Sequence, residues 1–184
     1  MINGVIVDAI ISEMNNCFGK DDGCFSMTRD VFAARLQSYI LETGMYLEAA
    51  IIGEIGNNTF DHNFGFNSAF PKGAYWNSVY MQKYTVLADY GRGIRQSLSQ
   101  VLPSIASDAE AVETAFVKRI SGRAPEQRGN GLKFVSEAIQ QNAWYLFFQS
   151  GFGSCSIDIK GITFLESTIP VPGCLAIIDF CGEK

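Results

Sequence analysis

The sequence predicts an α+β fold, a two-layer α/β sandwich in which helices cover one face of a mixed β-sheet. Three observations support this prediction. Helical apolar periodicity dominates the first third of the chain, strand-like apolar runs dominate the last third, and glycine-rich turns separate the segments. Packing helices on a sheet buries the apolar surface of both. The 184 residues fit one domain with an added N-terminal element.

Composition restricts the classes of partner. The net charge of −5, with 14 Lys and Arg residues, argues against a nucleic-acid surface, which needs a basic field. The chain has no apolar run of membrane-spanning length, and residues 1–12 lack the basic start of a signal peptide. The five cysteines form no C-x-x-C pair, which predicts reduced thiols. We therefore expect a cytoplasmic protein that binds neither nucleic acid nor a membrane.

Three helices are predicted in the first part of the chain, over residues 5–16, 28–42 and 46–62. Thr28 can cap the second helix and Gly44 ends it. Residues 1–45 contain none of the motifs that carry chemistry. We expect them to form a helical extension that packs on or beside the core, with a dimer seam as the alternative for their apolar faces.

A loop, strands and further helices are predicted after residue 62. Residues 63–77, rich in Asn, Gly and aromatic side chains, predict a loop that is either packed or partner-binding. The apolar run from Ser78 to Ala88 predicts a strand that ends at Asp89. Phe152-Gly153 predicts a hairpin turn. The other expected helices span 94–102, 107–120 and 130–141, and the other expected strands span 144–149, 154–160 and 175–180.

Glu54 and Asn58 lie four residues apart in the third predicted helix, so their side chains share one face. Glu54 is a candidate general base toward a water or a hydroxyl group. Asn58 offers an amide oxygen, a ligand type that suits Mg²⁺. A solvated polar helix face is the alternative for this pair taken alone.

Asp89 opens the sequence Asp-Tyr-Gly-Arg-Gly-Ile at the end of a predicted strand. A carboxylate is costly to bury without a partner, and the exocyclic amine of adenine is a suitable one. Such a bond contributes about 1.5–3 kcal/mol, and guanine would oppose it with a carbonyl. Gly91 and Gly93, followed by Ile94, would let the backbone approach the base. An ordinary turn is the alternative; a Rossmann fingerprint fails at Gln96.

The third motif is Arg128-Gly129-Asn130-Gly131-Leu132, where a predicted helix begins. Glycines at a helix start expose backbone N–H groups that can bind phosphate. The sequence G-x-x-x-x-G-K-[ST] does not occur, which excludes a P-loop. A plain turn is the alternative for this motif alone.

In this order the three motifs resemble the N, G1 and G2 boxes of the GHKL ATPase superfamily, which includes type II topoisomerases, sensor histidine kinases and anti-sigma-factor serine kinases. The resemblance implies a Bergerat-fold ATP-binding domain over residues 46–184, with ATP and Mg²⁺ as cofactors and a mobile ATP lid at about 94–128. It implies Glu54 as the catalytic base, Asn58 as the Mg²⁺ ligand and Asp89 as the acceptor of the adenine amine. The pocket lining and phosphate contacts implied by the motifs are Gly91, Gly93, Ile94, Arg128, Gly129, Asn130, Gly131 and Leu132, with Lys118, Arg119 and Arg123 of the lid as further candidates.

Two departures from the family pattern change these expectations. Cys174, after Pro172-Gly173, stands where the family often has Gly-Thr, so a thiol replaces a hydroxyl that helps to bind adenine. Adenine recognition would then rest more on Asp89. The single histidine, His62, lies inside the N box, which argues against a complete sensor histidine kinase.

The carboxylate at Glu54 is typical of superfamily members that activate a hydroxyl or a water. The small size is most similar to the stand-alone anti-sigma-factor serine kinases. We therefore expect an ATP-dependent protein serine/threonine kinase whose phospho-acceptor is a small regulatory partner. The alternatives are a slow ATPase and a non-catalytic ATP-binding module whose nucleotide state gates a protein interaction. A homodimer is compatible with each of these three functions.

Overall fold

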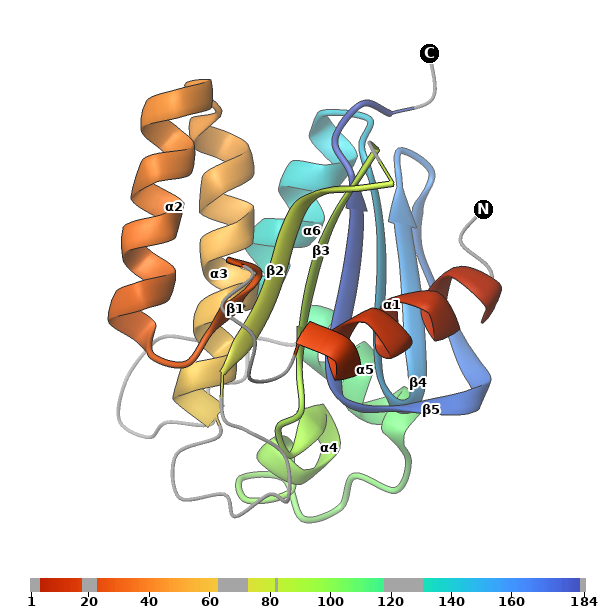
Figure 1. Cartoon of the computed structure of the whole chain (residues 1–184). Helices are drawn as coiled ribbons and strands as arrows, with labels where there is room; N and C mark the ends of the chain where they lie inside the picture. The colour runs from red at the N-terminus through yellow and green to blue at the C-terminus, as the bar shows by residue number, and fades with distance from the viewer. Residues whose placement is uncertain (1–3, 18–22, 63–72, 82, 118–130, 183–184) are drawn as a thin grey trace.

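The computed structural model describes residues 4–17, 23–62, 73–81, 83–117 and 131–182 (Figure 1). These residues form helices on a central β-sheet. The helices are α1 (Gly4–Cys17), α2 (Arg29–Thr43), α3 (Tyr46–His62), α4 (Gly93–Leu98), α5 (Asp108–Val117) and α6 (Gly131–Gln141); the strands are β1 (Phe25–Ser26), β2 (Ala74–Tyr80), β3 (Tyr84–Asp89), β4 (Tyr145–Asp158) and β5 (Gly161–Asp179).

The sheet has the strand order β1-β2-β3-β5-β4, and each of these pairings is antiparallel. The α+β class is confirmed, whereas the expected mixed sheet is wrong for the described strands. The physical reason lies in the connections. Parallel neighbours need a crossover, but β2 and β3 are joined by a tight turn, as are β4 and β5.

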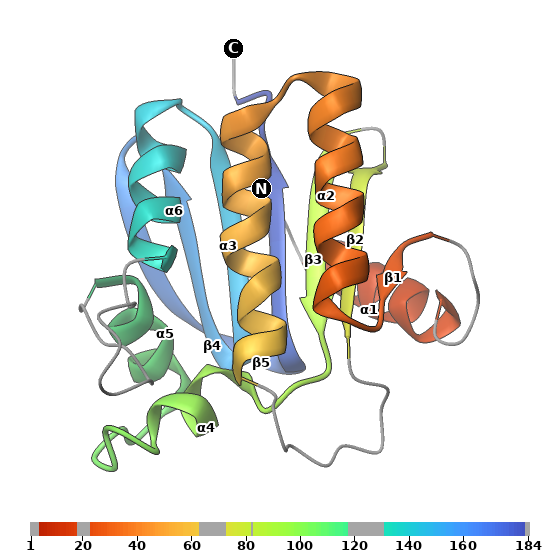
Figure 2. The ribbon, with the colours of Figure 1, turned by 90° about the vertical axis from the view of Figure 1, so that its left-hand side faces the viewer.

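Helices lie on both faces of the sheet, which corrects the expectation of a single covered face. Helices α2, α3 and α6 cover one face (Figure 2), and α5 adds Val112 and Phe116 to the same core. Helix α1 crosses the opposite face and buries Val7, Ile10 and Met14 against the sheet. The N-terminal extension is therefore divided between the two faces.

Helices α2 and α3 form an antiparallel pair that fixes the position of α3. Thr28 caps α2 by accepting a hydrogen bond from the backbone N–H of Val31, and Gly44 ends it in the left-handed conformation with φ of 69°. The ring of Phe32 lies directly on Gly56, where any β-carbon would overlap it. This close approach holds the part of α3 that carries Glu54 and Asn58.

The predicted strand over 78–88 is a β-hairpin. Strand β2 ends at Tyr80 and β3 begins at Tyr84, and Met81 adopts the left-handed conformation with φ of 51°. Strand β2 begins at Ala74, so Tyr75 and Trp76, assigned to a loop by the sequence, are buried strand residues. The turn was missed because it contains neither glycine nor proline. The rest of the expected loop, residues 63–72, lies outside the described residues.

Strand β4 spans both strands expected over 144–160 and bends between them. A straight strand of its length would extend about 45 Å, yet the side chains of Tyr145 and Ser156, near its two ends, lie close enough to interact. The bend lies where the register with β5 shifts, near Gly151 (φ of 58°) and Gly153, beside the predicted Phe152-Gly153 turn. Beyond it, residues 153–158 of β4 and 161–166 of β5 form a hairpin, which we call the β4–β5 arm.

Candidate functional site

Asp89 is the centre of the candidate site. It ends the buried strand β3 and is itself only 6% exposed. One carboxylate oxygen accepts a hydrogen bond of 2.6 Å from the backbone N–H of Gly91, and the other accepts one of 3.2 Å from the hydroxyl of Thr59 on α3. The turn after β3 and helix α3 therefore fix the orientation of the carboxylate.

Gly173 and Cys174 on β5 lie next to Asp89. Cys174 is the register partner of Asp89 in the sheet. Gly173 has φ of 70°, and a β-carbon there would collide with the backbone carbonyl of Asp89. Only glycine permits this approach without strain. The structure therefore brings the motif that begins at Asp89 next to the Gly173-Cys174 segment of β5.

Ser150 on β4 joins three segments around this point. Its hydroxyl donates a hydrogen bond of 2.8 Å to the carbonyl of Gly173 and accepts one of 2.9 Å from the backbone N–H of Ile94. Gly93 packs against the same hydroxyl, with φ of 72°. The start of α4 is thereby tied to β4 and β5.

The thiol of Cys174 is kept protonated by its surroundings. Burial raises the pKa of this thiol well above its ordinary value, and the negative charge of Asp89 raises it further. The hydrogen bond between the sulfur and Ser150 Oγ, at 3.7 Å, opposes the shift without reversing it. At neutral pH the site therefore holds a neutral thiol, a weak hydrogen-bond donor, beside the carboxylate.

Glu54 lies where the first and third motifs meet. Its side chain is exposed on α3, and its carboxylate lies over Gly131, where a β-carbon would collide with it. Asn58 is half-buried one turn further along α3. Gly131 begins α6, and the next residue, Leu132, is buried in the core. The structure thus brings Glu54 and Gly131 together at a helix N-terminus.

The basic residues expected near phosphate lie outside the described residues. These are Lys118, Arg119, Arg123 and Arg128, and the same holds for Gly129 and Asn130. His62 ends α3, and its side chain is likewise outside the description.

The first part of the expected lid belongs to the folded core. Val112 and Phe116 of α5 are buried, and the ring of Phe116 packs edge-on against Phe148 at 5.2 Å between ring centres. Asp108 accepts a hydrogen bond of 2.9 Å from the backbone N–H of Phe152. Apolar packing of this kind opposes opening of α5, and the lid over 94–128 stays a prediction.

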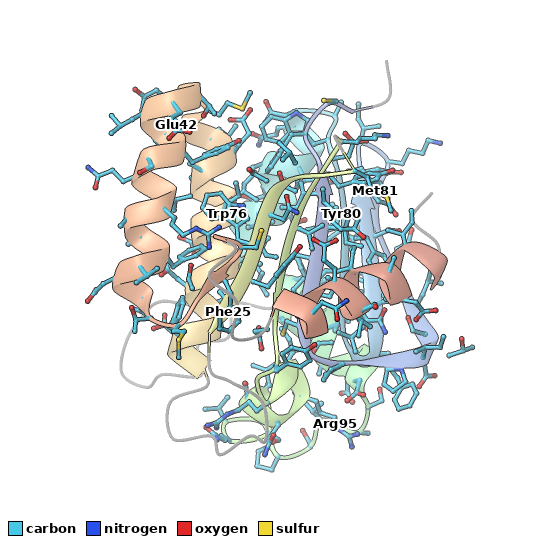
Figure 3. The ribbon with its side chains drawn as sticks, in the orientation of Figure 1. Phe25, Glu42, Trp76, Tyr80, Met81 and Arg95 are labelled. Carbon is cyan, nitrogen blue, oxygen red and sulfur yellow. The ribbon has the colours of Figure 1, made fainter. Side chains whose placement is uncertain are left out.

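A hollow of about 390 Å³ lies beside α4. Arg95, one of its lining residues, is 3.8 Å from Asp108 between the nearest charged atoms. Figure 3 shows Arg95 at the end of the molecule that carries α4, away from Met81 at the opposite end of the sheet. The hollow is lined by Arg92, Arg95, Gln96, Ser99, Ile105 and Asp108.

Two residues that orient Asp89 and its neighbours were missed by the sequence analysis. Thr59 directly follows Asn58 in the first motif, and its position on the buried side of α3 was the available signal. Ser150 is a polar residue in an apolar strand, directly before Gly151-Phe152-Gly153. A single serine in such a run is a weak signal, because its partners come from segments distant in sequence.

No protein-family model matches the chain, and no curated protein matches it. Within the described part of the chain, His, Cys, Asp and Glu side chains form no cluster of three or more that could hold a metal ion. None of the helices described is both long and apolar enough to cross a membrane.

Proposed function

We propose that the chain binds Mg-ATP at the end of the sheet that carries Asp89, in the manner of the GHKL superfamily. The observation that carries this proposal is the convergence of Asp89, Gly91 and Gly173, held by hydrogen bonds from Thr59 and Ser150. A buried carboxylate whose orientation is fixed at the end of a strand suits an amine donor. The antiparallel sheet with its helical layer is compatible with a Bergerat fold.

The neighbouring residues suit the other parts of the nucleotide. A carboxylate offers about four acceptor sites, so Asp89 can accept from the adenine amine while it keeps its bonds to Thr59 and Gly91. Asn58 would supply an oxygen ligand to Mg²⁺, which favours hard oxygen donors and phosphate partners. The N-terminus of α6 at Gly131 would lie toward the phosphates, where backbone N–H groups and the helix dipole favour anions.

Glu54 supports a catalytic role over binding alone. Its exposed carboxylate lies over the start of α6, next to the expected position of the phosphates. There it can take the proton from a protein hydroxyl or from water as the oxygen attacks the γ-phosphate. We propose a protein serine/threonine kinase in the cytoplasm that acts on a small regulatory partner. The second candidate is a slow ATPase, which the same carboxylate would serve with water as the acceptor.

Calorimetric titration of the wild-type protein with Mg-ATP and with Mg-GTP tests the binding proposal. We expect ATP to bind and GTP to bind at least about tenfold more weakly, because the guanine carbonyl would face the Asp89 carboxylate. Equal affinities, or no binding of ATP, would contradict the proposed pocket.

Glu54→Gln tests the catalytic role, with Glu48→Gln on the same helix as the matched control. We expect Glu54→Gln to keep ATP affinity and to lower turnover at least about 100-fold, since removing a general base costs rate and not binding. Turnover is measured with γ-labelled ATP. Label in a protein partner identifies the kinase, and label only in free phosphate identifies the ATPase. Unchanged turnover in Glu54→Gln would remove the carboxylate from the chemistry.

A further inference from the structure

The β4–β5 arm presents an open strand edge. Residues 161–166 of β5 pair with residues 153–158 of β4, while β3 pairs with β5 only over residues 174–178. Among the described strands, none pairs with the other side of residues 161–166. The N–H and C=O groups on that side can therefore accept another strand.

This edge lacks the usual protection against strand addition. Its sequence Ile162-Thr163-Phe164-Leu165 consists of strand-forming residues with an apolar bias, and the nearest proline is Pro170. The side chains of Ile159 and Leu165 are 67% and 57% exposed. Proteins commonly protect such edges with charges or proline within the strand. Here Lys160 and Glu166 stand at its two ends.

The positions of the charges make the edge complementary to itself. Antiparallel pairing about a two-fold axis at Thr163 places Lys160 of one copy opposite Glu166 of the other, twice in each dimer. Both side chains are exposed and have no ion pair among the described residues. Within one chain Lys160 lies in the turn just before β5, whereas Glu166 lies five strand positions after Gly161, about 17 Å along the strand. Oppositely charged residues directly across a strand pair stabilise the pairing.

The same register is complementary in shape and polarity. Ile162 and Phe164, which partly pack on the core, would lie opposite one another across the axis, and an aromatic–β-branched pair of this kind stabilises a sheet. On the other face the exposed Leu165 would lie over Gly161 of the second copy. The space above Gly161 is open, since a β-carbon built there would meet no atom within 4 Å.

We propose that residues 161–165 of β5 form a two-fold strand pairing between two copies of this chain, flanked by Lys160 and Glu166, which continues the sheet from one copy into the other. The occupant of the edge is a second copy because the register about Thr163 satisfies charge, apolar contact and space together. This pairing does not depend on nucleotide binding, so it stands or falls separately from the proposed function.

Sedimentation equilibrium of the full chain tests the pairing through a charge exchange. We expect the wild type to dimerise, and Lys160→Glu or Glu166→Lys to weaken dimerisation by about tenfold, because each creates two like-charge contacts per dimer. The double variant Lys160→Glu/Glu166→Lys restores opposite charges across the axis and should recover dimerisation to within about threefold of wild type. The control, Lys133→Glu/Glu137→Lys on the exposed face of α6, should leave dimerisation unchanged.

Hydrogen exchange supplies a second readout that does not depend on charge. Backbone amides within residues 161–166 should exchange more slowly as protein concentration rises, because the second copy pairs with them. A wild type that stays monomeric overturns the proposal. A dimer that the single exchanges do not weaken, or that the double exchange does not recover, also overturns it. A monomer whose edge pairs with a different protein would identify another occupant and would equally refute it.

Discussion

Asp89 and Asp179 stand at opposite ends of neighbouring antiparallel strands, and each is 6% exposed. Asp179 ends β5 opposite Tyr145, where it forms an ion pair of 2.8 Å with Lys83 and accepts a hydrogen bond from the backbone N–H of Cys181. Asp89 is oriented by the hydroxyl of Thr59 and its own turn, next to the thiol of Cys174.

The difference teaches how surroundings separate a structural carboxylate from a candidate binding group. At the far end, an ammonium group balances Asp179, and the same ammonium lies 5.1 Å from the centre of the Tyr84 ring. At the site end, Gly173 brings β5 close to Asp89, and the backbone N–H of Gly91 donates to its carboxylate. Burial alone does not distinguish the two carboxylates, whereas their neighbours do.

Replacing each carboxylate by its amide should affect a different property of the protein: ATP binding for Asp89 and stability for Asp179. Asp89→Asn should weaken Mg-ATP binding by about 10- to 100-fold, the equivalent of about 1.5–3 kcal/mol for a charge-assisted hydrogen bond. Asp179→Asn should leave ATP affinity unchanged and lower the unfolding temperature, because it removes the partner of Lys83. Calorimetry and thermal unfolding of both variants measure the two effects. If Asp179→Asn lost ATP binding and Asp89→Asn kept it, Asp179 and not Asp89 would be the binding carboxylate.

The thiols at the two ends should differ in reactivity. Because burial and Asp89 raise the pKa of Cys174, we expect its alkylation at mildly alkaline pH to be at least about tenfold slower than that of the exposed Cys181. Asp89→Asn should lower the pKa of Cys174 and speed its reaction. Cys155, whose pKa burial raises to about 12, serves as an unreactive reference. Mass spectrometry of timed samples gives the rates, and faster labelling at Cys174 than at Cys181 would contradict this view of the site.

Alanine substitutions at two glycines in the left-handed conformation can distinguish the cost of backbone strain from the cost of a steric clash. Gly173 and Gly44 have φ of 70° and 69°, but only Gly173 has backbone atoms where a β-carbon would stand. Gly44→Ala should cost about 1 kcal/mol of unfolding free energy, the usual cost of a left-handed alanine. Gly173→Ala should cost at least about 3 kcal/mol, since it also forces Asp89 away from β5. Denaturant unfolding measures both, and equal losses would show that the contact at Gly173 relaxes freely.

Alkaline pH should affect the ion pair of the far end. The hydrogen bond and the charge of Asp179 raise the pKa of Lys83 above 10.5, so the folded state holds this proton more tightly than the unfolded state. The stabilisation is complete below the unfolded pKa and is lost as pH rises through the folded pKa. Denaturant unfolding should therefore show a difference between wild type and Lys83→Met that is constant from pH 7 to 9 and declines above about 10.5. If the difference in unfolding free energy grew above that pH, the pKa of Lys83 would not be raised by folding.

Much of the helical layer could be predicted from the sequence. Helix α3 has its predicted bounds of 46–62, because Gly44 breaks the chain before it and apolar residues recur at helical spacing. The delivery of Asp89 to the end of a strand was also predicted, since an apolar run precedes it.

The strand connections and second partners could not be predicted in this way. Met81 makes a left-handed turn without glycine, so two strands looked like one. The packing of α1 on the opposite face depends mainly on residues of β2, β3 and β5, which are about 60 or more positions away. The hydrogen bonds of Thr59 and Ser150 likewise join segments that are distant in sequence, so local sequence patterns cannot predict them.

The most direct test of the account is a backbone amide NMR titration of the isotope-labelled wild-type protein with Mg-ATP. We expect shift changes to concentrate at the site end, around residues 54–59, 89–94, 131–132, 150 and 173–174. The far end, around residues 83–84, 143–146 and 179–182, should stay unchanged. Changes concentrated at the far end, or none with saturating Mg-ATP, would contradict the claim that Asp89 marks a nucleotide pocket.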